Sequence, residues 1–138
     1  MHELPWVIET NDAVKRLIEV EIRRSDPAVL SQEDLSRYII KVERIRMELG
    51  ALRKVKEEAF NFLFTQVSQG QFTEGATVEI TTVDALLRCR ACGHEWGSDE
   101  SGEALPLCPK CSSPGAELLR GNELNIVSVD FEYDLRSP

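Results

Sequence analysis

Apolar residues near the start of the chain recur at the spacing of one helical face. The series runs through Val7, Val14, Ile18 and Ile22. Pro5 suits the first turn of a helix, so we expect a helix over residues 5–23. The polar connection that follows, over residues 24–36, could hold a short helical turn started by Ser31.

The pattern then alternates between strand-like and helix-like periods. Residues 38–49 are rich in Ile and Val and predict a strand whose inward-facing side changes midway, ended by Gly50. Residues 54–69 repeat apolar positions on one stripe, which predicts a second amphipathic helix. Residues 76–88 and 123–133 alternate apolar and polar positions, which predicts two more strands.

This order of elements predicts an α+β fold. A small three-stranded sheet would carry both helices on one face, and a zinc-ribbon-like subdomain would be inserted between the last two strands. Residues 1–85 and 121–138 would then form an α/β domain, and residues 86–120 the inserted domain. Three strands and two helices bury only a thin core, so metal binding would add stability that apolar burial does not supply.

Four cysteines lie within the predicted insertion as two Cys-x2-Cys pairs, with 15 residues between the pairs. The pairs are Cys89 with Cys92 and Cys108 with Cys111. This is the ligand spacing of a structural zinc site, in which two tight turns bring four thiolates into a tetrahedron around the ion. Gly93 and Pro109 suit the sharp turns that such pairs require.

The cysteine pairs have three alternatives to a structural zinc site. Two disulfides would suit an oxidising compartment, but the start of the chain lacks the basic and apolar stretches of an export signal. A catalytic zinc, as in a hydrolase, would keep one position open for water, whereas four thiolates saturate the ion. His94, two residues after Cys92, could compete with a cysteine as a ligand.

Charge and composition narrow the classes of function. The 138 residues carry a formal charge of −8, and four ionised cysteines around one zinc ion would bring it to about −10. Many zinc ribbons bind nucleic acid, but an acidic chain repels it, and Arg88, Arg90 and Lys110 would instead offset the thiolate charge. No run approaches the roughly 18 apolar residues of a membrane helix. We therefore expect a soluble, cytoplasmic protein whose partners are neither nucleic acid nor membrane.

The start of the chain is a second candidate metal site. The α-amine of Met1 and the amide and Nδ1 nitrogens of His2 close adjoining chelate rings, and the amide of Glu3 can add a fourth nitrogen. Four nitrogens in a plane suit Ni(II) or Cu(II), whereas zinc prefers a tetrahedron. The alternative is that His2 is an ordinary exposed terminal residue and that Glu3 only favours the positive end of the first helix.

Several short segments, in order along the chain, resemble the HypA family of nickel-insertion proteins for hydrogenase and urease. They are Met1-His2-Glu3-Leu4, Met47-Glu48-Leu49-Gly50, the two cysteine pairs and Gly121-Asn122-Glu123-Leu124-Asn125-Ile126. The resemblance spans nearly the whole chain. The cysteine pairs occur in many zinc proteins and are not specific to this family. The Met-His-Glu start combined with the Gly-x-Glu-Leu segment is much more specific to it.

The resemblance implies a metallochaperone rather than an enzyme, which binds Ni(II) and transfers it to a nickel enzyme such as NiFe-hydrogenase. The implied nickel ligands are Met1, His2 and Glu3, with His94 as a candidate addition. The implied ligands of a structural Zn(II) are Cys89, Cys92, Cys108 and Cys111. The nickel ligands would lie in the domain of residues 1–85 and 121–138, and the zinc in the domain of residues 86–120.

The resemblance also implies protein partners. They are a HypB-type GTPase accessory protein and a hydrogenase large subunit or the urease maturation system. The chain has no glycine-rich phosphate loop of its own, so nucleotide hydrolysis would come from a partner. A homodimer is a candidate assembly that composition does not decide.

Two features depart from the family pattern. The connection over residues 24–36 is longer than usual, which could alter a partner surface or the oligomeric state, and Ser112 stands where a glycine often follows the last cysteine. The competing functional interpretation is a zinc-ribbon adaptor that bridges other molecules and binds no second metal.

Overall fold

The computed structural model describes residues 3–136 and places the chain in the α+β class, as predicted. Its helices are α1 (Leu4–Ser25), α2 (Gln32–Leu35), the 3-10 helix η1 (Ala51–Arg53) and α3 (Glu57–Val67). Its strands are β1 (Tyr38–Gly50), β2 (Thr77–Val83), β3 (Leu86–Cys89), β4 (Glu95–Gly97), β5 (Ala116–Arg120) and β6 (Leu124–Leu135). Among the helices of the described residues, none has the length and apolarity needed to cross a membrane.

The chain forms two compact units. Unit 1 consists of Met1–Arg46, Lys56–Glu79 and Ile126–Pro138, and unit 2 of Met47–Val55 and Ile80–Asn125. Each unit has its own buried side chains.

Unit 1 is built on the helical face that the sequence predicts for α1. Val7, Val14, Ile18 and Ile22 are all fully buried. α1 contacts α3, which buries Phe60 and Phe64 on its inner side. The apolar stripes of the two helices therefore supply a large part of the core of this unit, beside the buried residues of β1.

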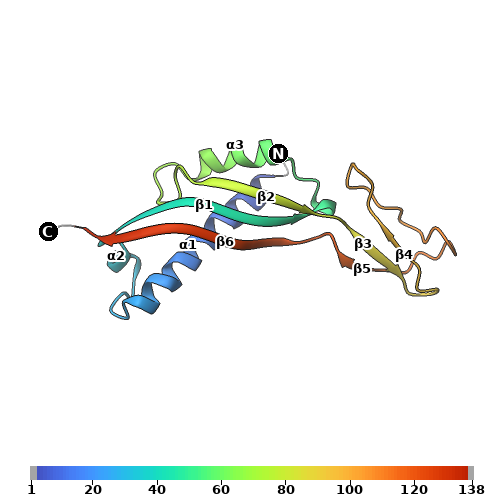
Figure 1. Cartoon of the computed structure of the whole chain (residues 1–138), viewed down its shortest axis with the longest axis horizontal. Helices are drawn as coiled ribbons and strands as arrows, with labels where there is room; N and C mark the ends of the chain where they lie inside the picture. Colours follow the sequence, from blue (N-terminus) through green and yellow to red (C-terminus); the bar gives the residue numbers. More distant parts are fainter. Residues whose placement is uncertain (1–2, 137–138) are drawn as a thin grey trace. The chain divides into compact units, whose positions relative to one another are not determined.

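The first sheet has the strand order β2-β1-β6, which leaves β2 and β6 at its edges. Figure 1 shows β1 and β2 running in the same direction, with β6 opposite to both. α3 is the crossover between the two parallel strands, as parallel pairing requires. The buried positions of β1 include Val42 and then Ile45, so its inward-facing side changes midway as predicted.

The observed elements differ from the sequence prediction in three ways. The single strand expected over residues 76–88 is divided into β2 and β3, which belong to different sheets. The helix expected over residues 54–69 is shorter, because Lys54 has left-handed backbone geometry (φ 53°) and separates η1 from α3. β4 and β5, which flank β3 in the second sheet with the order β4-β3-β5, were not predicted.

A close crossing of three backbone segments explains the division between β2 and β3. A Cβ atom on Gly121 would lie 2.7 Å from the Cβ of Ala85, and one on Gly50 would collide with the Gly121 carbonyl. Gly50 and Leu52 donate hydrogen bonds to the carbonyls of Glu123 (2.8 Å) and Gly121 (3.0 Å). The glycines at this point in unit 2 are therefore required by the close approach itself.

Candidate metal centre

Each cysteine pair lies on a tight turn with the same set of backbone hydrogen bonds. At the first turn, Gly93 N–H donates to the Cys89 carbonyl (2.9 Å) and Cys89 N–H donates to the His94 carbonyl (2.8 Å). At the second, Ser112 N–H donates to the Cys108 carbonyl (2.8 Å) and Cys108 N–H donates to the Ser113 carbonyl (3.0 Å). The two turns are thus structural copies of each other.

The sheet β4-β3-β5 positions the first turn. Cys89 ends β3 and pairs with Ala116 of β5, while the other edge of β3 pairs with β4, which follows the turn. Arg90 N–H donates to the Gly115 carbonyl at 2.9 Å, which ties the turn to the segment that leads into β5. The short strands therefore hold the cysteine side chains in a fixed direction.

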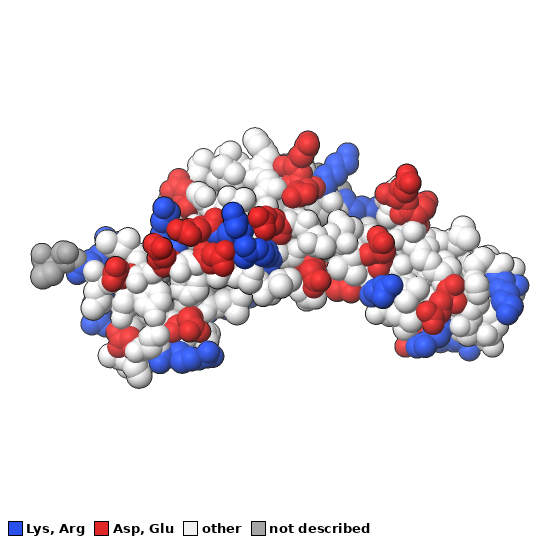
Figure 2. Space-filling view, in the orientation of Figure 1, with Lys and Arg blue, Asp and Glu red and all other residues white. Residues whose placement is uncertain are grey.

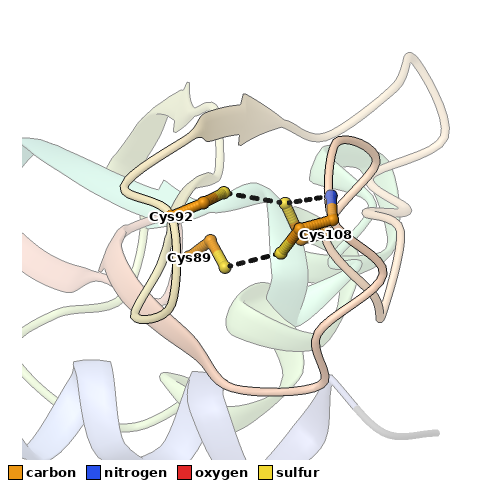
Figure 3. A group of neighbouring side chains, drawn as sticks. Cys89, Cys92 and Cys108 are labelled. Atoms are coloured by element: carbon orange, nitrogen blue, oxygen red, sulfur yellow. Dashed lines mark hydrogen bonds between the residues drawn. The ribbon is translucent and has the colours of Figure 1, made fainter.

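The four cysteine side chains converge on one point, as predicted from their spacing. Their Sγ atoms all lie within 4.8 Å of one another. Across the two turns, the Sγ atoms of Cys89 and Cys111 are 3.5 Å apart and those of Cys92 and Cys108 are 3.6 Å apart. Figure 3 shows Cys89 and Cys92 pointing from the first turn toward Cys108 on the second. All four are free thiols rather than disulfides.

This geometry fits a tetrahedral metal ion. A zinc–sulfur distance of about 2.3 Å places the sulfurs of a regular tetrahedron about 3.8 Å apart, close to the observed separations. The group contains four sulfur ligands, and among residues 3–136 it is the group of metal-ligating side chains that could hold an ion. A set of four thiolates would fill the coordination sphere and leave no position for a reactive water.

The pKa values of Cys89, Cys108 and Cys111 are shifted in different directions. Hydrogen bonds from backbone amides, first that of Cys92, lower the pKa of Cys89 to about 6 against the opposing effect of burial. Burial raises the pKa of Cys108, but the amides of Cys111 and Lys110 outweigh it and the net shift is downward. The Ser113 amide lowers the pKa of Cys111, but its hydrogen bond to Cys89 and its burial raise it to about 12. A metal ion binds the thiolate form of cysteine, so a divalent ion would displace the protons that these thiols still carry.

Trp96 covers the buried side of the cysteine cluster. Its side chain packs with Cys89 and Cys108, and Leu87 and Ala116 lie against the same group. The indole N–H donates to the Leu105 carbonyl at 3.0 Å, which fixes the ring over the sulfurs. Trp96 was not among the residues predicted from the sequence, although its place in a short run after the first cysteine pair could have indicated a role.

His94 is not part of the sulfur cluster. Its ring stacks on that of Trp96, with 6.2 Å between the centroids and 13° between the planes. The group of potential ligands among the described residues contains the four cysteines without it. The imidazole thus packs beside the centre while its backbone carbonyl supports the first turn.

The predicted nickel ligands are only partly within the described residues. Met1 and His2 lie outside them. Glu3 is buried, with 6% of its surface exposed, and its carbonyl accepts a hydrogen bond from Val7 N–H at 3.0 Å. Glu3, itself one of the three predicted nickel ligands, therefore lies at the beginning of α1.

Comparison with known proteins decides the family. Residues 19–131 match the family described as "Hydrogenase/urease nickel incorporation, metallochaperone, hypA". The chain belongs to the HypA family. HypA-family proteins are metallochaperones of nickel incorporation and hydrogenase maturation, and this chain is accordingly a maturation factor.

Individual HypA proteins are similar over most of their length. The hydrogenase maturation factor HypA of Methanococcus maripaludis strain S2 is 31% identical over 134 residues, which are 97% of this chain and 98% of that protein. The hydrogenase maturation factor HypA of Acidithiobacillus ferrooxidans strain ATCC 53993 is 35% identical over 104 residues, or 75% of this chain and 89% of that one.

A solved structure shares the fold. The solution structure of the Ni metallochaperone HypA from Helicobacter pylori aligns over 94% of this chain and 97% of its own, with a TM-score of 0.52 and 20% sequence identity. The arrangement of helices and strands in this HypA-family chain thus occurs in a structure of another family member.

Proposed function

We propose that this HypA-family chain binds Ni(II) at its N-terminus and delivers it for maturation of a nickel enzyme such as NiFe-hydrogenase. The ligands are the Met1 amine, the amide and imidazole of His2, and Glu3. The observation that most supports this assignment is the position of Met1-His2-Glu3 immediately before α1. The first helical hydrogen bond holds Glu3, so less conformational freedom is lost when the chelate closes around an ion.

The four-cysteine centre holds a structural Zn(II) in this proposal. Two of its ligands, Cys89 and Cys108, are buried against Trp96, so the ion would complete the small core of unit 2. Saturated sulfur coordination suits a role in shape rather than in transfer, whereas nitrogen ligands at a chain terminus can exchange their ion. The two metals are thus separated by ligand chemistry.

Delivery of nickel requires partners. The proposed partners are a HypB-type GTPase accessory protein and either a hydrogenase large subunit or the urease maturation system. Delivery would take place in the cytoplasm. The family's description, which names both hydrogenase and urease, supports this range of clients. A homodimer and a nickel contact from His94 stay predictions.

The experiment that tests the nickel site compares four forms of the full-length protein. Ni(II) affinity is measured by calorimetry for the native chain, for His2→Ala, for a form with one residue added before Met1, and for His94→Ala. Since the chain has only two histidines, His94→Ala is compared with His2→Ala, and it also tests the candidate nickel contact from His94. We expect His2→Ala and the added residue to weaken binding at least about a hundredfold, since each removes a ring of the chelate.

His94→Ala should leave most of the nickel affinity intact. Strong nickel binding in the His2→Ala and extended forms would contradict the terminal chelate. Weak binding in all four forms would favour the zinc-ribbon adaptor.

The chelate also predicts a pH dependence of nickel affinity. The Met1 amine and the His2 imidazole, with ordinary pKa values of about 8 and 6.5, must both be deprotonated to bind. Protons therefore compete increasingly as the pH falls, and affinity should drop at least about tenfold between pH 8 and pH 6. Equal affinities at the two values, measured in the same weakly coordinating buffer, would exclude these ligands.

A further inference from the structure

Strand β6 has one backbone edge without a strand partner among residues 3–136. It is the last strand in the order β2-β1-β6 and is 12 residues long. Figure 1 shows no strand beyond β6 on the side toward which α1 extends. A long free edge of this kind is a template to which another strand can add.

An apolar groove of about 540 Å³ lies beside this edge within unit 1. Its apolar lining includes Leu17 and Ile18 of α1 and Val127, Val129 and Phe131 of β6, and its polar lining consists of Glu21, Ser128 and Tyr133. Leu17 is 50% exposed and Val127 62% exposed, so both face solvent inside the groove. Figure 2 shows a largely uncharged surface between β6 and the projecting part of α1. Contiguous exposed apolar surface is typical of an interaction site.

The opposite face of β6 is acidic. Strand alternation places Asp130, Glu132 and Asp134 on the face away from the groove. Asp130 bonds to Arg46 of β1 at 3.1 Å. Figure 2 shows positive and negative side chains interleaved over the first sheet. Glu132 and Asp134 are exposed, and the described part of the chain offers neither of them an ion pair. The C-terminal half of β6 therefore carries two carboxylates, those of Glu132 and Asp134, that have no ion-pair partner among the described residues.

We propose that β6 and its groove form a docking surface for an extended segment of a partner protein in which apolar and basic residues alternate. The segment adds to the free edge of β6 through main-chain hydrogen bonds. Its apolar side chains enter the groove against Leu17 and Val127. Its basic side chains, on the other face, lie beside Glu132 and Asp134, where cross-strand pairs of opposite charge are favourable.

A second copy of this chain fits the surface less well. Pairing two β6 strands would bring the acidic faces of two chains of charge −8 together, and like charges across strands are destabilising. Charged side chains on an edge strand are a common defence against self-pairing. Here the carboxylates of β6 would repel a second copy of this chain and attract a basic partner. The partner would thus be selected partly by repulsion of the alternative.

The test uses the full-length protein and three short capped peptides with a fluorescent label. The first alternates valine with lysine, the second alternates valine with glutamate, and the third has the composition of the first with its valines and lysines in separate blocks. Binding is measured by anisotropy and located by amide chemical shifts. The alternating valine–lysine peptide should bind at least about tenfold more tightly than either control, with shifts in β6 and around Leu17.

Variants at exposed positions test the groove and the acidic face of β6 separately. Val127→Lys and Leu17→Lys should each weaken the valine–lysine peptide several-fold, whereas Ile39→Lys, at a position 54% exposed outside the groove, should not. The double variant Glu132→Lys/Asp134→Lys should reverse the preference toward the valine–glutamate peptide. Far-UV circular dichroism checks that each variant is folded.

Four outcomes would overturn the proposal. They are equal binding of the block peptide, shifts located away from β6, an equal loss of binding in Ile39→Lys, and sedimentation showing a dimer that Val127→Lys dissociates. The nickel ligands are not involved, so failure of this test leaves the nickel proposal untouched.

Discussion

At the scale of single residues, the two cysteine turns differ at one position. Gly93 and Ser112 both have left-handed backbone geometry, with φ of 79° and 62°, and donate equivalent hydrogen bonds. Glycine adopts this geometry freely, whereas a side chain such as that of serine costs about 1–2 kcal/mol there. The serine that departs from the family pattern is therefore a site of backbone strain.

Ser112→Gly should stabilise the second turn. Relief of strain exceeds the extra flexibility gained by the unfolded chain, so we expect a net gain of about 0.5–1 kcal/mol. Thermal unfolding of the zinc-loaded protein measures it. Ser113→Gly is the matched control, because Ser113 Oγ accepts a hydrogen bond from Gly115 N–H at 3.3 Å and its loss should destabilise. A lower melting temperature for Ser112→Gly would contradict this account.

Asp26 and Tyr38 give stability a pH dependence. The Tyr38 hydroxyl donates to Asp26 Oδ2 at 2.6 Å, and this bond is the main reason that the pKa of Asp26 lies below its usual value. A carboxylate with a lowered folded-state pKa contributes stability above its unfolded pKa of about 4 and loses it as the pH falls through the folded value. The bond therefore stabilises the fold at neutral pH but not in strong acid.

Tyr38→Phe should consequently destabilise the protein more at pH 6 than at pH 2.5. Urea unfolding at the two pH values measures the difference. Tyr133→Phe is the control, because Tyr133 donates to the neutral Ser25 hydroxyl at 2.9 Å and its loss should be independent of pH over this range. Equal pH dependence in both variants would show that the Asp26 bond does not carry the effect.

At the scale of elements, the two faces of α3 should contribute differently to stability. Phe60 is fully buried and Phe62, two residues later on the same helix, is 65% exposed. Phe60→Ala should cost about 3–5 kcal/mol of unfolding free energy, and Phe62→Ala should cost little because no core contact is lost. Both values come from denaturant unfolding. Similar losses in the two variants would mean that α3 is not anchored by its inner face.

The helices and β1 could be predicted because their signals are local. An apolar stripe at helical spacing, or an alternation at period two, reflects the face that an element buries. Asn11 interrupts the stripe of α1 for a reason that is not local: it is buried, and its side chain bonds to Thr73 (2.6 Å) and Gln71 (2.9 Å), about 60 positions along the chain. Such a pairing has no trace in a periodic pattern.

The break between β2 and β3 was beyond local reasoning for the same cause. Residues 76–88 keep the pattern of one strand, but Gly121 passes so close to Ala85 that the strand path divides there. β4 has only three residues, too few to show a period. The cysteine spacing did predict that the four thiols meet, because it encodes the turns directly. The domain limits at residues 86 and 120 and the terminal nickel ligands stay predictions.

At the scale of the whole molecule, each unit has its own source of stability. The cluster in unit 2 consists of Cys89, Trp96 and Cys108, with Leu87 and Ala116 packed against it. It is small and includes two of the proposed metal ligands. The core of unit 1 depends instead on the buried faces of α1 and α3.

Removal of metal should therefore loosen unit 2 and spare unit 1. Hydrogen exchange with a strong chelator should show faster exchange in β3, β4 and β5, while α1 and α3 keep their protection. Cys111→Ser, measured without chelator, should reproduce this pattern because it removes one thiolate. Uniform loss of protection across both units would contradict independent stabilisation.

The central position of β1 has a consequence for biosynthesis. Its neighbour β6 is formed by Leu124–Leu135, and Arg136 donates to the Arg37 carbonyl at 2.8 Å across about a hundred positions of the chain. A ribosome must therefore release residues 124–135 before β1 gains its second flanking strand, because pairing between distant segments comes late. Until β6 emerges, the nascent chain therefore presents an unpaired edge of β1, which is open to pairing with other strands.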